Sequence, residues 1–250
     1  AMRISDYGFI SDSQSSALVG RDGSIDWYCL PRFDSPSVFA RLLDENAGYW
    51  FIRPAGEFRS EWSYVGYSLV LRIVFRSKTG SVALTDALML EPGSREHQIG
   101  KRVPHVLLRS IEGLQGEVDL EMEFSPRFEY GLTYPRFDPS DRGWRAWGSA
   151  VDLELRSSVE TRYRDDSIHA CFTVRAGYKT TFSLALGGSY CGEPLHEIDV
   201  ESSLQDTIDA WHSWMDIHKG YQGLYREQVR RSALVLQGLT YQPSGAVIAA

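Results

Sequence analysis

Hydrophobic and polar residues alternate with a period of two along most of the first 200 positions. The clearest example is segment 118–124, in which four apolar side chains alternate with three acidic ones. The same alternation recurs in segments 69–75, 151–156, 168–174 and 182–186. Because successive side chains of a strand point to opposite faces, this pattern predicts strands with one face on a core and the other in water.

Shorter apolar segments between these are also predicted to be strands: 17–19, 25–29, 49–53, 82–88 and 106–111. The first two are separated by Gly-Arg-Asp-Gly, whose Asp-Gly pair suits the positive φ values of a hairpin turn. About ten strands with turns between them, and no helical segments interleaved, predict a mainly β fold, a large antiparallel two-sheet β-sandwich.

The pattern changes from strand to helix after Glu201, and Ser202 or Ser203 is the expected N-cap. Apolar residues then recur at the spacing of one helix face, and a second such stripe follows a glycine-containing break. The first stripe is Leu204, Ile208, Trp211 and Met215, and the second is Tyr225, Val229, Ser232, Leu236 and Leu239.

These patterns divide the chain into a β-sandwich domain over residues 1–200, a helical linker over 201–220 and the beginning of a second domain over 221–250. The apolar tail 246–250 has no polar close, so we expect the chain to be cut from a longer protein. An isolated stub 221–250 would expose its apolar stripe, and we expect it to pack across the sandwich or onto a second copy, forming a homo-oligomer.

Composition narrows the class of partner. Thirty-three acidic against 26 basic side chains give a net charge of −7, which offers no broad basic field for nucleic acid or anionic lipid. No apolar run approaches the ~20 residues that cross a bilayer. The three cysteines, Cys29, Cys171 and Cys191, lack a paired spacing. A cytoplasmic protein with free thiols, binding neither nucleic acid nor membrane, is therefore predicted.

Motifs for catalysis or cofactor binding are scarce. The six histidines show no metal-ligand spacing, and no glycine-rich phosphate loop follows a predicted strand. Serines 13, 15 and 16 lack the G-x-S-x-G context of a nucleophile. The sequence accordingly predicts no metal site, no cofactor and no catalytic residue.

Segment 25–39 departs from this plain pattern, because it places three charged and four aromatic side chains in fifteen residues around two prolines. That composition is typical of a rigid loop pressed against another surface. Arg32 and Asp34 are candidates for a buried polar network. Trp27 and Phe33 are candidates for packing on a neighbouring domain or for stacking on a sugar ring. Both interdomain packing and direct substrate contact stay open.

A second candidate is the stretch 141–148, which we expect to be a loop. There, Trp144 and Trp147 would present parallel rings to a sugar, as in a carbohydrate-binding module. The alternative is that one ring covers the end of the sandwich and the other is partly exposed.

Several longer motifs stand at the start and in the middle of the chain: residues 6–12 (DYGFISD), 17–27 (ALVGRDGSIDW), 29–39 (CLPRFDSPSVF) and 126–131 (PRFEYG). They resemble the N-terminal domain of the bacterial glucoamylases and trehalases of glycoside hydrolase family 15. Trp211 and Trp214, together with segment 231–246, are similar to the linker and first barrel helix of that family.

The resemblance implies a parent protein with a large β-sandwich (supersandwich), a helical linker and an (α/α)6 barrel that hydrolyses α-glucosidic bonds with inversion. Inversion requires two carboxyl groups about 6.5–9.5 Å apart. The resemblance places both glutamates in the barrel, beyond residue 250, so this chain alone is expected to be inactive. It would support the C-terminal (α/α)6 catalytic domain of the same polypeptide. Its residues 27–39 would form a rim near an α-glucoside: trehalose, a maltooligosaccharide or an isomaltooligosaccharide.

Overall fold

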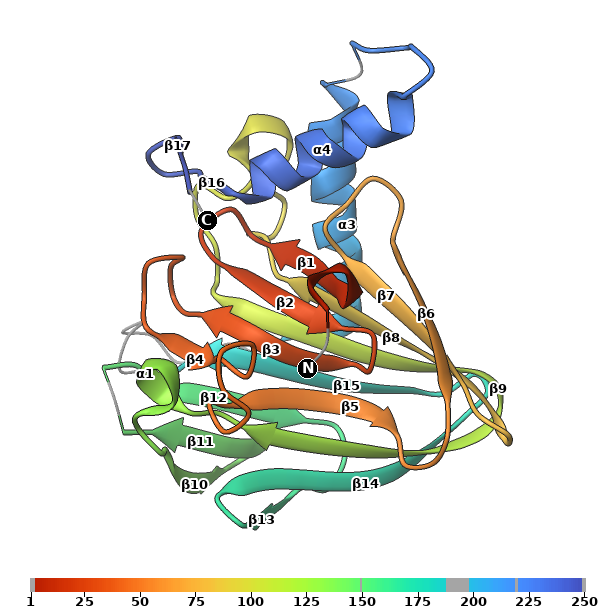
Figure 1. The fold of residues 1–250 in the computed structure, drawn as a ribbon, viewed down its shortest axis with the longest axis vertical. Coiled ribbons are helices and arrows are strands. Elements are labelled where there is room, and N and C mark those ends of the chain that lie inside the picture. Colours follow the sequence, from red (N-terminus) through yellow and green to blue (C-terminus); the bar gives the residue numbers. More distant parts are fainter. Residues whose placement is uncertain (1–2, 149, 188–197, 219, 249–250) are drawn as a thin grey trace.

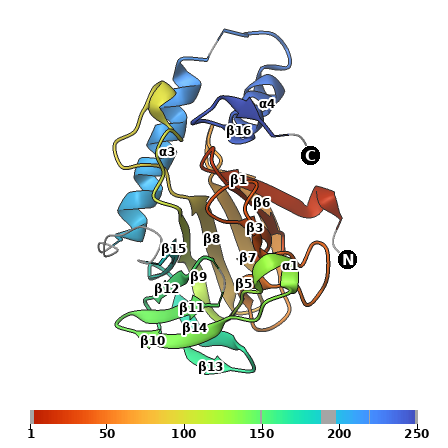
Figure 2. The same ribbon diagram turned by 90° about the vertical axis from the view of Figure 1, so that its left-hand side faces the viewer.

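The computed structural model describes residues 3–148, 150–187, 198–218 and 220–248, and its body is a β-sheet folded into two layers (Figures 1 and 2). The first layer contains β1 (Tyr7–Ser11), β2 (Ser16–Gly20), β3 (Ser24–Cys29), β4 (Ser37–Phe39), β5 (Tyr49–Pro54), β13 (Arg162–Arg164) and β14 (Ser167–Arg175). The second contains β6 (Arg59–Tyr64), β7 (Leu71–Arg76), β8 (Gly80–Leu88), β10 (Arg136–Ser140), β11 (Gly143–Trp147), β12 (Leu153–Ser157) and β15 (Lys179–Leu186). Strand β9 (Val106–Ser125) belongs to both.

All pairings between the described strands of these layers are antiparallel, which confirms the prediction of a mainly β, antiparallel fold. The first layer runs β1-β2-β3-β5-β9-β14-β13, with β4 also beside β3, and the second runs β6-β7-β8-β9-β15-β12-β11-β10. Apolar side chains of both layers meet in one core, where Trp50 of β5 packs edge-on against Phe182 of β15 at 6.4 Å between ring centroids. This burial of apolar surface stabilises the sandwich.

Strand β9 joins the layers, and it replaces the two strands predicted at 106–111 and 118–124. Its first part pairs with β8 and β15, and its second part, from Glu117, pairs with β5 and β14. Gly113 and Gly116 lie where the strand passes between layers. A Cβ atom at Gly113 would lie 2.0 Å from the Arg175 carbonyl oxygen, and Gly116 has a φ of +64°. The glycines interrupt the alternation in the sequence, which is why one strand looked like two.

Helix α3 (Val200–Asp216) covers the outer face of the second layer (Figure 2). Three residues of its predicted stripe, Leu204, Trp211 and Met215, are buried there with apolar side chains of β8, β9 and β15. The helix begins earlier than expected. Its N-cap is Asp199, whose carboxylate accepts the Ser202 N–H at 3.2 Å, so the prediction of a serine cap was wrong.

Helix α4 (Arg226–Gly238) crosses the end of the sandwich and is followed by a small hairpin of β16 (Thr240–Tyr241) and β17 (Ala246–Val247) (Figure 1). The stripe predicted for this helix is not its buried face. Tyr225, Val229 and Leu236 are 66%, 42% and 58% exposed, whereas Leu234 and Gly238 are buried. Two arrangements were expected for this segment, packing across the sandwich or onto a second copy. The helix packs on the sandwich, but its apolar stripe lies in solvent.

The two cysteines that the structure describes have free thiols. Cys29 is buried and Cys171 exposed, and neither forms a disulfide. Burial raises the pKa of the Cys29 thiol to about 12. Cys191 lies outside the described residues. No helix in the described part of the chain is long and apolar enough to cross a membrane.

Candidate functional site

The predicted site segment 25–39 is a loop only in its centre. Its ends form β3 and β4, which pair with each other, and the turn between them covers residues 30–36. Strand β3 confirms the strand predicted at 25–29, whereas β4 was predicted as part of the loop, because the prolines and charges of the turn masked the strand signal of residues 37–39. The turn lies at the end of the sandwich where the C-terminal hairpin also lies (Figure 1).

Arg32 and Asp34 form an ion pair with each other at the surface of this turn. Arg32 Nε and Nη2 donate to the two carboxylate oxygens of Asp34 at 2.9 and 2.5 Å, and this bond lowers the pKa of Asp34. Their side chains are 49% and 69% exposed, so the expected burial of this pair is wrong. The Arg32 guanidinium also lies 5.4 Å from the ring centroid of Tyr241 in β16, which connects the turn to the C-terminal hairpin.

Phe33 and Trp27, the two aromatic candidates, are half-buried and contact different neighbours. The Phe33 N–H donates to the Gln14 carbonyl oxygen at 2.9 Å. The Trp27 ring lies 6.2 Å from that of Tyr130. The structure therefore brings Arg32, Phe33 and Asp34 together at the turn and places Trp27 against another element.

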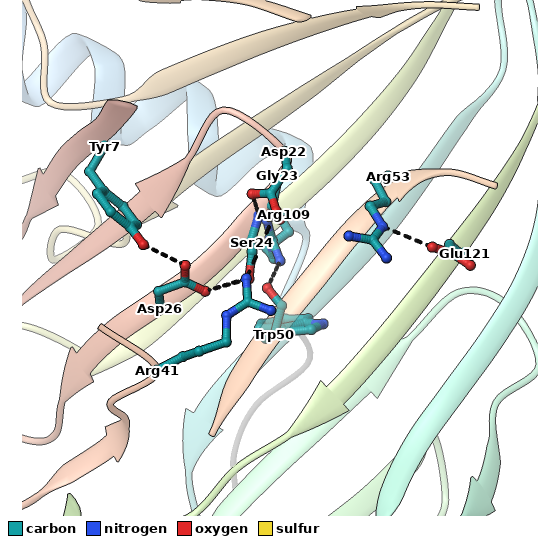
Figure 3. Close-up of polar contacts among 10 residues, drawn as sticks. All are labelled: Tyr7, Asp22, Gly23, Ser24, Asp26, Arg41, Trp50, Arg53, Arg109 and Glu121. Atoms are coloured by element: carbon teal, nitrogen blue, oxygen red, sulfur yellow. Dashed lines mark hydrogen bonds and ion pairs between the residues drawn. The ribbon is translucent and has the colours of Figure 1, made fainter. Parts of the chain in front are cut away.

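The buried polar network of this region is centred on Asp26, which is 2% exposed (Figure 3). Its carboxylate accepts hydrogen bonds from the Tyr7 hydroxyl at 2.7 Å and the Ser24 hydroxyl at 2.6 Å, and it pairs with Arg41 at 2.8 Å. Burial and the bond to Asp26 raise the pKa of the Tyr7 hydroxyl. Asp26 was one of the three charges noted in the segment, but its place in an apolar strand was the signal of burial.

A second network, in the core between the layers, holds Arg109 and Asp86, both 0% exposed (Figure 3 shows Arg109). Arg109 donates to both oxygens of Asp86 at 2.8 and 3.0 Å, to the Trp50 carbonyl oxygen at 2.8 Å and to the Gly23 carbonyl oxygen at 2.6 Å. One guanidinium thus links β9, β8, β5 and the turn before β3. The sequence carried a signal for this pair, because each charge interrupts an apolar strand segment.

The turn Ser11–Ser15, between β1 and β2, connects the sandwich to the C-terminal elements. The Ser11 and Ser13 hydroxyls donate to the carbonyl oxygens of Gly238 at 2.6 Å and Gln237 at 3.1 Å, at the end of α4. The Ser13 carbonyl oxygen accepts the Gln242 N–H at 2.9 Å. From the sequence, Ser13 was considered only as a nucleophile and Ser11 was given no role of its own. Their role in the structure is to hold the last turn of α4.

Asp12, in the same turn, is 0% exposed. Its Oδ1 accepts the backbone N–H groups of Gln14 at 2.8 Å and Ser15 at 2.7 Å, while its Oδ2 has no hydrogen-bond partner. Burial raises the pKa of this carboxyl from 3.8 to about 7. Asp26 and Asp86 are bonded to arginines, whereas hydrogen bonds from two backbone N–H groups hold Asp12.

Helix α4 rests on the sandwich through an arginine and a glycine. Arg231 donates to the Ser68 carbonyl oxygen at 2.6 Å and the Gly66 carbonyl oxygen at 3.0 Å. A Cβ atom at Gly238 would lie 2.5 Å from Cδ1 of Leu69 and 2.8 Å from a ring carbon of Phe9, so a larger residue would force these side chains to move. The end of the sandwich is therefore shaped to receive α4.

Residues 1–194 match the family described as trehalase-like, N-terminal.

The chain belongs to the trehalase-like N-terminal domain family.

This trehalase-like domain is also similar to longer proteins. It is 31% identical over 99% of its length to a trehalase of Mycolicibacterium smegmatis and 30% identical over 99% to a trehalase of Mycobacterium tuberculosis. It is 35% identical over 97% of its length to trehalase 1 of Sulfolobus acidocaldarius. The chain spans 39% of the length of each of these curated relatives. The matched region extends beyond residue 194, so it includes most of α3 and α4.

Trp144 and Trp147 of the trehalase-like domain lie on strand β11 and not in a loop. In a strand, residues i and i+3 point to opposite faces, so the predicted parallel presentation of the rings is wrong. Trp144 is half-buried against the core and donates to the Thr161 hydroxyl at 2.9 Å. Trp147 donates to Asp138 at 2.6 Å, and the Arg136 guanidinium lies 5.4 Å from its ring centroid.

The residues of this site hold neighbouring elements of the fold in position. Within the described residues, no group of three or more His, Cys, Asp or Glu side chains is arranged to hold a metal ion. The buried carboxylates Asp26 and Asp86 are each committed to an arginine, and Asp12 has no exposed surface. What the domain offers at this end is a rigid turn, the seat of α4 and an exposed ion pair.

Proposed function

We propose that this trehalase-like domain is the N-terminal structural domain of an inverting α-glucoside hydrolase of glycoside hydrolase family 15, with trehalose as the substrate. The observation that carries the proposal is the match of 97–99% of the chain to trehalases of which it spans only 39%. A C-terminal catalytic domain of the (α/α)6 type would follow in the same cytoplasmic polypeptide and supply both catalytic carboxyl groups. The domain divisions 1–200, 201–220 and 221–250 belong to this proposal.

Helix α4 supports an arrangement in which the next domain begins on the sandwich. One side of the helix is held by Arg231, Gly238 and the Ser11–Ser15 turn. The other side presents Tyr225, Val229 and Leu236 to solvent. A helix that is held on one side and exposes apolar side chains on the other fits the first helix of a helical barrel, because further helices would bury those side chains.

The activity of the longer polypeptide tests this function directly. We expect it to hydrolyse trehalose and to release one α- and one β-glucose per molecule, because inversion acts on one of the two rings. The 250-residue chain alone should show no turnover, since the acid and base lie outside it. Proton NMR before mutarotation measures both the rate and the anomers. Preference for a maltooligosaccharide or an isomaltooligosaccharide would overturn the substrate, and turnover by the 250-residue chain would overturn the division of roles.

We further propose that the turn 30–36 forms one rim of the substrate site, with Arg32 and Asp34 nearest to the sugar. The contact of Arg32 with Tyr241 supports this, because it places the turn beside the chain segment that leads to the next domain. The Arg32–Asp34 pair is exposed, so its removal should cost the fold little.

Replacing Arg32 by alanine in the longer polypeptide is therefore expected to raise KM for trehalose about tenfold, which corresponds to about 1.4 kcal/mol of lost binding. Its unfolding midpoint should not change. Arg175→Ala, which removes an exposed pair with Glu117 on β14 and β9, is the matched control and should leave KM unchanged. Unaltered kinetics in the Arg32 variant would refute a rim contact and leave the turn with a packing role.

A further inference from the structure

The short helix α1 (Phe128–Gly131), in the PRFEYG motif, is a turn in an unusual backbone conformation. Glu129, Tyr130 and Gly131 have successive φ values of 56°, 61° and 92°. Side chains other than glycine, asparagine and aspartate rarely occupy this left-handed region. Two such residues in succession cost free energy, and the surrounding contacts must hold them there.

Contacts with Thr133, Ser37 and Ala47 hold the turn in this conformation. Phe128 is buried, and its backbone exchanges two hydrogen bonds with Thr133, at 2.8 and 3.1 Å. The Tyr130 N–H donates to the Ser37 hydroxyl of β4 at 3.0 Å. A Cβ atom at Gly131 would lie 2.9 Å from that of Ala47, so the turn lies directly against the segment between β4 and β5.

The held turn presents large apolar side chains to solvent. Tyr130 is 49% exposed, Leu132 83% and Tyr134 55%. The neighbouring segment between β4 and β5 adds Leu43, which is 66% exposed. We call these four residues the α1 patch. Exposed apolar residues scattered singly are ordinary, but a group of them beside a strained turn, with Tyr130 in the turn itself, indicates a surface that is covered by another body.

The position of the C-terminal elements indicates which part of the protein could cover this patch. In Figures 1 and 2 the β16–β17 hairpin lies above α1 on the same side of the molecule. The β3–β4 connection links the two, because Arg32 contacts Tyr241 of β16 and Ser37 bonds to Tyr130. The C-terminal hairpin thus lies on the side of the molecule that carries α1, and the curated relatives contain a further 61% of their length outside the matched region.

We propose that the α1 patch is a docking surface for the polypeptide that follows residue 250. The second domain would then be held at two separate places, α4 and the α1 patch, with the turn 30–36 between them. This inference rests on the proposed function in one respect only, namely that a further domain follows in the same chain.

Photo-crosslinking on the longer polypeptide tests the contact. The photoreactive residue p-benzoylphenylalanine replaces Leu132, which has an ordinary φ of −75° and an exposed side chain. The matched control carries it at Tyr178, which is 69% exposed between β14 and β15. After irradiation, mass spectrometry should find crosslinks from position 132 to peptides beyond residue 250, and only background from position 178. Crosslinks between two copies, or background from both positions, would overturn the proposal.

A stability measurement gives an independent readout. Leu132→Ser should lower the unfolding midpoint of the longer polypeptide and leave that of the 250-residue chain unchanged, because the leucine is buried only when the second domain is present. Leu114→Ser, at an exposed position of β9, should change neither. An equal effect of Leu132→Ser on both proteins would contradict docking. Trehalose hydrolysis measured on the same samples separates this outcome from failure of the proposed function.

Discussion

Replacing Arg109 by methionine is expected to lower the free energy of unfolding by about 3–5 kcal/mol, because it leaves a buried carboxylate without its partner. Arg109 and Asp86 are both inaccessible to solvent, and the guanidinium also bonds the carbonyl oxygens of Trp50 and Gly23. The substitution would therefore leave one charge and two carbonyl groups unsatisfied in the core. Urea unfolding followed by tryptophan fluorescence measures the loss.

Two further variants separate the buried charge from the size of the side chain. Arg175→Met removes an exposed arginine and should change stability by less than about 1 kcal/mol. The double variant Arg109→Met with Asp86→Leu should recover most of the loss, because no charge is left buried. A loss in the double variant as large as that in Arg109→Met would show that packing, and not the unpaired carboxylate, sets the cost.

Asp12→Asn is expected to stabilise the domain at pH 8 and to remove much of its pH dependence. The pKa of Asp12 is raised by burial from 3.8 to about 7 in the folded chain. Between these values the folded state holds a proton that the unfolded state has released, so stability falls as pH rises. The shift corresponds to about 4 kcal/mol lost between pH 4 and pH 7, with no further loss above. Asparagine cannot ionise, so its variant should be about 2–4 kcal/mol more stable at pH 8.

Urea unfolding at several pH values between 5 and 8 measures this difference. Tyr28, which interacts with the charge of Asp12, and its neighbour Cys29 do not titrate between pH 5 and 8. Burial raises the pKa of Cys29 to about 12 and that of Tyr28 well above its usual value. Asp34→Asn is the control. The bond to Arg32 lowers the pKa of Asp34, so removing that carboxyl should leave the slope intact. Parallel pH profiles for the Asp12 variant and the unchanged protein would contradict the assignment.

The elements that the sequence predicted well are those in which burial follows the side-chain period. Val118, Leu120, Met122 and Phe124 alternate with acids and are all at most 2% exposed. Strand β6 was missed because it lies at a sheet edge and buries no side chain fully, so it has no clean apolar face. The hairpin of β10 and β11 was missed because its proline, its glycine and its charges are typical of a loop.

The candidate site was predictable as a region and not as a set of contacts. Segment 25–39 does lie beside the C-terminal elements, but the buried acid in it is Asp26 and the candidates Arg32 and Asp34 are exposed. Helix α4 shows the same limit. Its apolar stripe suggested a buried face, whereas close approach at Gly238 and hydrogen bonds from Arg231 decide which face meets the sandwich. Such contacts depend on residues more than 160 positions apart.

The shared strand β9 has a consequence for how the protein is made. Its partners β5 and β8 precede it in the chain, while β14 and β15 follow it, so the first layer is incomplete until residue 175 has left the ribosome and the second until residue 186 has. Until then, β9 offers unpaired backbone edges to other nascent chains. We expect protein shortened before β14 to aggregate during translation, and chaperone demand to end once both late strands have been synthesised.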